Sequence, residues 1–299
     1  MNRQTTIETA AAKDVLGIYQ PGSTHMVGDG FPVRNLFPSN ELDREVSPFL
    51  MLDYAGPQYF TPTDHPRGVG EHPHRGFETV TIVYEGMLAH RDSAGNAGVI
   101  GPGDVQWMTA GNGIVHEEFH SQDFTRKGGP LQMVQLWVNL RATDKTAKPR
   151  YQTLLKAQIP TVELPDNAGS LRVIAGDFGG QPGPAKTFSR INLWDVDLRA
   201  GKSAELALPN GHTTTFLVLS GEVTVNGERE AKEGDLAIFA RDGDGITVKA
   251  KANAKLLVMD GEPFDEPVVG QGPFVLNSRA EIRQAFEDYQ LGRMGEISA

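Results

Sequence analysis

Two short segments place histidine and carboxylate side chains at a spacing that suits metal binding. His72 and His74 are separated by one residue, and His116 and Glu118 repeat that spacing. On a β-strand, residues i and i+2 point to the same face with Cα atoms roughly 6.7 Å apart, so both members of a pair can reach one ion. If both strands face one interior, three nitrogens and one oxygen converge. Such a set suits Fe(II), Ni, Zn, Cu or Mn, and redox metals held in this way are typical of oxygenase centres.

The choice of carboxylate is open on spacing alone. Glu78 shares strand parity with the first histidine pair, whereas Glu118 belongs to the second pair. One carboxylate would bind the metal, and the other would act as a general base or hold a ligand histidine. His65, His90 and His120 are interpreted as ordinary histidines, although His120 shares the parity of Glu118 and could line the site.

The segments that must position these residues read as short strands separated by glycine turns. Residues 77–85 are rich in β-branched and aromatic side chains, and residues 131–139 alternate in the manner of a half-buried strand. A second strand-rich region covers residues 191–260, and only the last segment reads as a helix, because Ser278 and Glu281 form a capping box. The first half therefore predicts a small antiparallel structure around the two histidine pairs.

The two strand-rich regions resemble each other. In each, a strand enters a glycine turn, at Gly86 or Gly221, and a Gly-Asp pair follows, at 103–104 or 234–235. This repetition predicts one small β-barrel used twice. The second copy contains His212 where the first has a histidine pair, and no histidine follows its Gly-Asp pair. We therefore expect the second barrel to hold no transition metal.

Composition excludes several classes of protein. The 299 residues include 28 Lys and Arg against 38 Asp and Glu, which gives a net charge of −10 and argues against direct nucleic-acid binding. The absence of cysteine excludes disulfides, thiolate nucleophiles and cysteine-based metal sites. No apolar run approaches the about 18 residues of a membrane span, and residues 1–20 lack the apolar core of a secretory signal. The expectation is a cytoplasmic protein with no membrane partner.

Four long motifs resemble the pirin family, whose members contain two cupin barrels. They are HPHRGFETVTIVYEG (72–86), PGDVQWMTAGNGIVHEE (102–118), LQMVQLWVNL (131–140) and GPFVLNSRAEIRQAFEDYQLG (272–292). The resemblance implies an all-β fold of two cupin barrels, of the double-stranded β-helix or jelly-roll type, packed face to face, with a short C-terminal helix. The expected units are a metal-binding barrel (1–140), a connecting segment (141–190), a metal-free barrel (191–262) and an extension packing back on the first barrel (263–299).

The same resemblance implies a ligand set. In the family, one iron is bound by three histidines and a glutamate, which correspond here to His72, His74, His116 and Glu118. It favours Glu118 over Glu78 as the ligand and leaves Glu78 as a wall residue or a support for a ligand. Iron(II) is the expected metal, and Ni, Zn, Cu, Mn or Co would be accepted by the same donors.

The resemblance implies two kinds of function. The first is quercetin 2,3-dioxygenase activity, in which a flavonol-like aromatic substrate is opened by O₂ with release of carbon monoxide and Glu118 removes the substrate proton. Candidate walls for a flat substrate are Phe77, Trp107, Met108 and Trp137. The alternative is an iron-dependent redox sensor that binds a transcription factor or a metabolic enzyme. An apolar mouth beside the metal would favour the enzyme, and the paired barrels favour a monomer.

Overall fold

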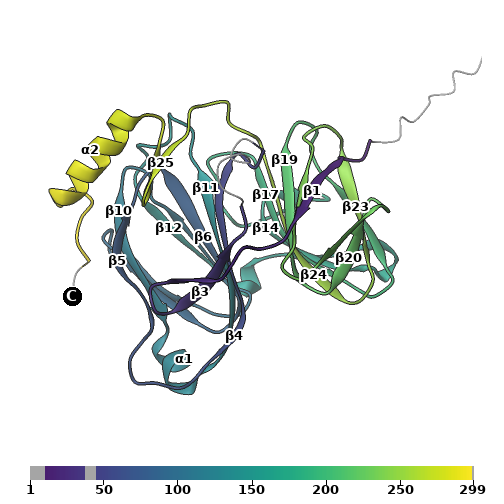
Figure 1. The fold of residues 1–299 in the computed structure, drawn as a ribbon, viewed down its shortest axis with the longest axis horizontal. Coiled ribbons are helices and arrows are strands. Elements are labelled where there is room, and N and C mark those ends of the chain that lie inside the picture. Colours follow the sequence, from purple (N-terminus) through teal and green to yellow (C-terminus); the bar gives the residue numbers. More distant parts are fainter. Residues whose placement is uncertain (1–10, 38–44, 298–299) are drawn as a thin grey trace, which may run out of the picture.

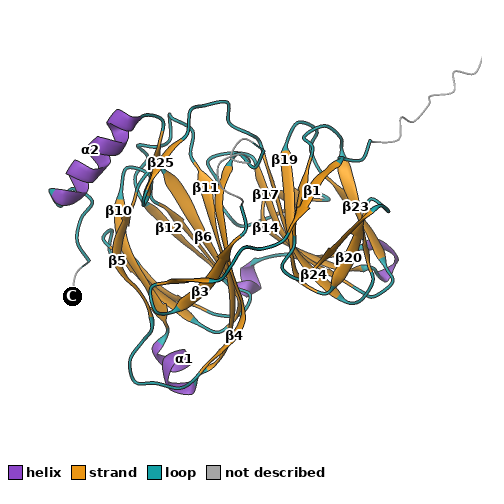
Figure 2. Ribbon diagram, viewed as in Figure 1, coloured by secondary structure: helices purple, strands orange, loops and turns teal. Residues whose placement is uncertain are grey.

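The computed structural model describes residues 11–37 and 45–297 and contains two β-barrels side by side (Figure 1). Each barrel is formed by a seven-stranded sheet and a four-stranded sheet. Strands dominate and helices are short (Figure 2). The predicted all-β architecture of two cupin barrels is confirmed. No helix among the described residues is long and apolar enough to cross a membrane.

The first barrel contains the motifs with the histidine pairs. In spatial order, its seven-stranded sheet consists of β12 (Arg150–Leu154), β9 (Val105–Thr109), β6 (Phe77–Glu85), β11 (Gly129–Asn139), β4 (Phe49–Phe60), β3 (Phe31–Asn35) and β2 (His25–Val27). Its four-stranded sheet consists of β5 (Gly68–His74), β10 (Ile114–His120), β7 (Leu88–Asp92) and β8 (Ala97–Ile100).

The second barrel repeats this arrangement. Its seven-stranded sheet consists of β1 (Val15–Tyr19), β22 (Leu236–Phe239), β19 (Thr213–Ser220), β24 (Ala254–Gly261), β17 (Ile191–Leu198), β14 (Gly169–Ala175) and β13 (Thr161–Glu163). Its four-stranded sheet consists of β18 (Ser203–Ala207), β23 (Gly245–Ala250), β20 (Glu222–Val225) and β21 (Arg229–Lys232).

Short elements complete the described chain. They are the hairpins β15 (Asp177–Phe178) with β16 (Gln181–Pro182) and β25 (Val269–Gln271) with β26 (Phe274–Leu276), the helices α1 (Gln122–Lys127) and α2 (Arg279–Gln290), and the 3₁₀ turns η1 (Lys156–Gln158) and η2 (Pro165–Asn167). The helix α2 begins after Ser278, whose side chain accepts a hydrogen bond from the Glu281 amide. The helix α1 has only six residues, too few for a hydrophobic period to reveal it in the sequence.

The two seven-stranded sheets pack face to face and share one apolar layer. Strand β6 shows how the residues divide: Val80 and Ile82 lie in this layer, whereas Thr81 points into the first barrel toward β10. The layer also contains Leu217 and Leu257 of the second barrel. Because side chains alternate along a strand, one face of each sheet joins the barrels and the other lines a barrel interior.

Both ends of the described chain cross between the barrels. Strand β1 pairs with β22 in the second barrel, so residues 15–19 differ from their predicted place within a first unit of 1–140. At the other end, Phe274 forms a β-bridge with Arg75, and Lys145 Nζ donates a hydrogen bond to the Val275 carbonyl. Edge strands with free hydrogen-bonding groups accept a strand from any part of the chain, which local patterns do not encode. The domain boundaries themselves stay a prediction.

Candidate metal centre

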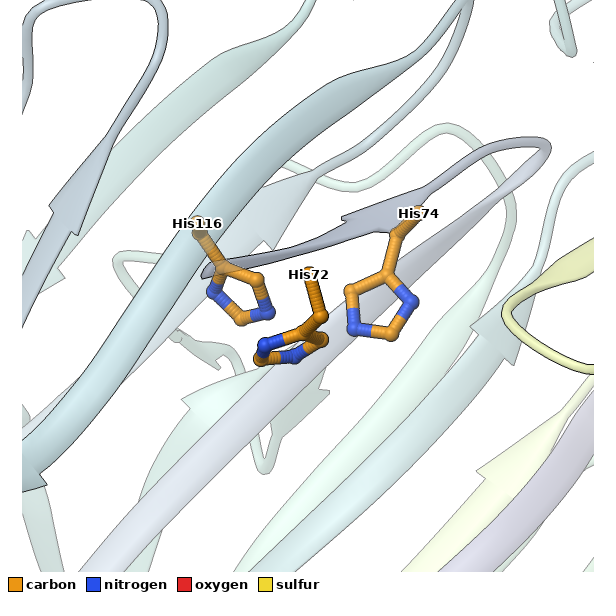
Figure 3. A group of neighbouring side chains, drawn as sticks. All are labelled: His72, His74 and His116. Carbon is orange, nitrogen blue, oxygen red and sulfur yellow. The ribbon is translucent and has the colours of Figure 1, made fainter. Parts of the chain in front are cut away.

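The register of two neighbouring strands brings three histidines together. In the antiparallel pair of β5 and β10, His116 lies opposite His72, and Ile114 lies opposite His74. The ring centroid of His116 is 4.3 Å from that of His72 and 4.9 Å from that of His74. One nitrogen of each ring lies within 4.8 Å of the others. Figure 3 shows the three rings gathered on one side of their strands.

Protein contacts at Nδ1 leave the other nitrogen of each ring for a ligand. His72 Nδ1 lies 2.8 Å from the Gly70 carbonyl oxygen, and His74 Nδ1 lies 3.4 Å from that of Pro273. His116 Nε2 is buried and has no hydrogen-bond partner among the residues that the structure describes. An orphaned buried nitrogen is rare, and one that lies beside two further histidine rings fits a bound metal ion.

Burial keeps the His74 and His116 rings in the neutral form that binds metal. Removal from water, reinforced by the nearby His72, lowers the pKa of His74 to about 3. Burial, together with the other histidines, also lowers the pKa of His116 well below its ordinary value. A neutral imidazole offers a lone pair, whereas a protonated one does not. Two of the three candidate ligands are therefore ready to bind a cation at neutral pH.

Glu118 lies beside this cluster and is held by the opposite sheet. Gln135 Nε2 donates to Glu118 Oε2 at 3.0 Å, and Thr81 Oγ1 donates to Oε1 at 3.4 Å. A carboxylate oxygen of Glu118 lies within 4.8 Å of ligand nitrogens of His116 and His90. His116 thus belongs to both groups of potential ligands, and Glu118 extends the three-histidine cluster along β10.

His90 was interpreted from the sequence as an ordinary histidine, but it contacts the cluster directly. Its Nδ1 lies 3.4 Å from His116 Nδ1 and 2.9 Å from Gln106 Nε2, and its Nε2 lies 3.2 Å from an oxygen of Asp92. The amide of Asn96 donates to the same Asp92 carboxylate. The signal in the sequence was His90 and Asp92 at the spacing i, i+2, the pattern that identified the ligand pairs.

Glu78 lies on the other face of its strand. The chain turns at Gly76, which has a φ of 90°, so the strand parity of β5 does not continue into β6. Glu78 is buried toward the other barrel, where Thr109 Oγ1 donates to it at 2.6 Å and Arg150 lies 3.9 Å away. The sequence interpretation of Glu78 as a wall of the site or a support for a ligand was wrong.

His120 and His65 lie apart from the cluster. His120 Nε2 is 2.9 Å from the Gly30 carbonyl oxygen, and its ring packs against Phe60 and Phe124. His65 is exposed in the loop before β5. Sharing the parity of Glu118 was therefore insufficient to place His120 in the site, since it lies one further step along β10.

An apolar cavity of about 390 Å³ opens onto the cluster. Of the predicted wall residues, Trp137 lines it and stacks on Phe77 at a centroid distance of 4.2 Å. Trp107 is instead buried between the barrels, and Met108 packs against Ala110. The lining residues are His25, Val27, Phe31, Val33, Met51, Asp53, Val69, His72, His74, Glu118, Met133, Gln135 and Trp137.

The second barrel contains different chemistry at the corresponding position. His212 Nδ1 pairs with Asp260 at 2.9 Å, and Thr214 donates to the same carboxylate. Its interior is filled by apolar side chains that include Trp194 and Phe216. Within residues 11–37 and 45–297, both groups of three potential metal ligands lie in the first barrel.

Two β-barrels joined through their large sheets, with a histidine cluster inside one of them, define the class of bicupin proteins. The profile of the Pirin family matches residues 30–138, and that of the Pirin C-terminal cupin domain matches residues 193–295. A Pseudomonas aeruginosa protein with the provisional name quercetin 2,3-dioxygenase is 57% identical over 281 residues, which cover 94% of this chain and 98% of that protein. The chain belongs to the pirin family, as the sequence motifs predicted.

More distant relatives support the same family assignment. Human pirin is 34% identical over 276 residues, covering 90% of this chain and 89% of the human protein. A crystal structure of quercetin 2,3-dioxygenase from Acinetobacter baumannii superposes with a TM-score of 0.93 at 48% identity, covering 96% of this chain and all of the other. Cupin dioxygenase relatives imply a metal cofactor, and the donors found here fit one.

Proposed function

We propose that this pirin is a quercetin 2,3-dioxygenase that binds iron(II) through His72, His74, His116 and Glu118. The observation that carries the proposal is the apolar cavity, because His72, His74 and Glu118 line it. The names of the Pseudomonas and Acinetobacter proteins support the same activity. The redox-sensor alternative requires the ligands but gives no reason for a cavity of this kind beside them.

Three imidazoles and one carboxylate form the proposed donor set. Such a set accepts Fe(II) and also Ni, Zn, Cu, Mn or Co, so availability contributes to the choice of metal. When bound, the metal supplies Lewis-acid polarisation of a substrate oxygen and a path for electrons to O₂. The remaining requirements of the reaction, which are orientation, exclusion of water and proton transfer, fall to the residues of the chain.

Glu118 is suited to take the proton of the flavonol 3-hydroxyl. Its carboxylate faces the cavity, and Gln135 and Thr81 hold it from the opposite sheet. A carboxylate has about four acceptor positions, so two protein contacts and a bond to the metal would leave one for a substrate hydroxyl. A base fixed within hydrogen-bonding reach of its proton contributes typically about 10²–10⁴-fold to a rate.

The cavity walls suit a flat aromatic molecule. Trp137 presents an indole ring already fixed by stacking on Phe77, and Val33 and Met133 add apolar surface. The volume of about 390 Å³ is within the usual range for small-molecule sites. These walls exclude water from the ligand cluster and orient the substrate with its hydroxyl toward Glu118.

The test is quercetin turnover by protein reconstituted with Fe(II), followed by O₂ consumption and carbon monoxide release. The informative variant is Glu118→Gln, and the matched control is Glu117→Gln, because Glu117 pairs with Arg91 at 2.7 Å on the outer face of the same strand. We expect a rate at least ~100-fold lower for Glu118→Gln and an unchanged rate for Glu117→Gln. Stoichiometric metal in the wild type without carbon monoxide release would exclude this activity.

A further inference from the structure

A row of polar side chains crosses the inner face of the large sheet of the first barrel. It contains Gln106 on β9, Thr81 on β6, Gln135 on β11, Asp53 on β4 and Asn35 on β3, each paired with the next in the strand register. Residues directly paired in an antiparallel sheet point to the same face. The row therefore faces β10 and β7, which contribute the potential metal ligands and His90.

Most of this row is bonded to the opposite sheet. Gln106 contacts His90, and both Thr81 and Gln135 contact Glu118. Asp53 differs, because its one hydrogen bond within the described chain comes from Asn35 Nδ2, at 3.1 Å to Oδ1. The other carboxylate oxygen of Asp53 accepts no hydrogen bond from the residues that the structure describes.

Asp53 nevertheless lines the cavity and is only 7% exposed. A carboxylate removed from water is costly unless it is bonded, so a buried one with a free oxygen is expected to have a partner that binds from outside the chain. His25 lines the same cavity, yet no hydrogen bond joins it to Asp53 within the described residues. Val33 and Met51 are among the apolar side chains that line this cavity. The second oxygen of Asp53 is thus an acceptor that its polar neighbours Asn35, Gln135 and His25 leave without a hydrogen bond, in a cavity whose other walls are largely apolar.

We infer that Asp53 determines substrate specificity by accepting a hydrogen bond from a ring hydroxyl of the substrate. Asp53 is paired with Gln135 on the adjacent strand, about 4.8 Å away along the sheet, and Gln135 itself contacts Glu118, so both carboxylates line the same part of the cavity. The inference rests on the proposed function. It narrows the substrate class to planar polyphenols that have one hydroxyl at the ligand cluster and a second ring hydroxyl within reach of Asp53.

Flavonol binding tests this inference apart from catalysis. Dissociation constants are measured without O₂ by quenching of tryptophan fluorescence, since Trp137 lines the cavity while Trp107 and Trp194 are buried elsewhere. The two probes are quercetin and 3-hydroxyflavone, which keeps the 3-hydroxyl and lacks every ring hydroxyl. The variants are Asp53→Leu and Asp53→Asn, and Asp64→Asn at an exposed loop position is the control.

Loss of a hydrogen bond to a charged acceptor corresponds to about 10- to 100-fold in affinity. We expect Asp53→Leu to weaken quercetin binding by that factor while 3-hydroxyflavone binding changes by about two-fold or less. Asp53→Asn keeps an uncharged acceptor, so its loss is smaller, and it provides the same comparison if Asp53→Leu fails to fold. The Asp64→Asn control should bind both flavonols like the wild type.

Two results would overturn the inference. In one, the Asp53 variants bind quercetin and 3-hydroxyflavone more weakly by the same factor; in the other, their preference for quercetin over 3-hydroxyflavone equals that of the wild type. Failure of a wild-type protein to bind either flavonol would overturn it together with the proposed function. Binding with the expected preference but without turnover would remove the dioxygenase proposal and leave the role of Asp53 in place. Turnover of quercetin by the wild type, together with an unaltered preference for quercetin in Asp53→Leu, would keep the dioxygenase proposal and remove the role of Asp53.

Discussion

Replacement of His90 by phenylalanine is predicted to weaken metal binding although His90 is outside the proposed ligand set. His90 Nδ1 lies 3.4 Å from His116 Nδ1, and this contact orients the His116 ring. Asp92 holds the other nitrogen of His90, Nε2. Phenylalanine keeps the ring that stacks on Tyr151 at a centroid distance of 4.7 Å. The substitution therefore removes the nitrogen atoms while preserving most of the packing.

The size of the effect follows from the contact that is lost. Without an acceptor at His90, the His116 ring is free to turn, and its Nδ1 is buried without a partner. Loss of such a supporting hydrogen bond typically lowers metal affinity about 10- to 100-fold, or about 1.4 to 2.8 kcal/mol. Asp92 stays anchored by Asn96, and the contacts that are lost are those of His90 with His116, Gln106 and Asp92.

The assay is the dissociation constant for Co(II), determined by competition with a chromophoric chelator. The matched control is His120→Phe, because His120 is also a buried histidine of this barrel but bonds to the Gly30 carbonyl among phenylalanine side chains. We expect weaker Co(II) binding for His90→Phe and unchanged binding for His120→Phe. Equal affinity of His90→Phe and the wild type would refute the reasoning that His90 positions His116.

Two further predictions concern stability. Burial raises the pKa of Glu78 to about 7, so the stability contributed by its protonated form is present below about pH 4.5 and is lost as the pH rises through 7. In urea unfolding, the free energy of unfolding of Glu78→Gln should therefore gain on the order of 2 kcal/mol relative to the wild type between pH 5 and 8. A difference between the two proteins that does not change with pH would exclude this linkage. Lys145 Nζ donates to the Gly76 and Val275 carbonyls and to Asn139 Oδ1. Lys145→Met should therefore lower the free energy of unfolding by about 2–4 kcal/mol and accelerate amide hydrogen exchange in β26. Unchanged exchange in β26 would show that this anchor is dispensable.

The predicted fold and the proximity of the histidines depended on local patterns that survive in the structure. The spacing of His72 and His74 set both side chains on one face of a strand, and the long motifs identified the family. The pairing of β5 with β10 then brought His116 opposite His72. Alternation along one strand is a short-range property, so it can be read from the chain directly.

The remaining features depend on contacts between distant segments. Glu78 was misplaced because strand parity restarts after the turn at Gly76. His90 shows the same i, i+2 spacing with Asp92 as the ligand pairs, but the residues that His90 and Asp53 lie opposite are set by strand register rather than by sequence proximity. The pairing of β1 with the second barrel likewise reflects the availability of a sheet edge. No pattern within one segment contains this information.

The most direct test of the central claim is the metal content of the purified chain, compared between the wild type and His74→Ala after reconstitution with Fe(II) and removal of unbound ion. His74 is buried, and its ring lies against His116 and His72. The account predicts one ion per wild-type chain and almost none in His74→Ala, with His120→Ala retaining its ion. A full ion in His74→Ala, or none in the wild type, would contradict the assignment of the metal to this cluster.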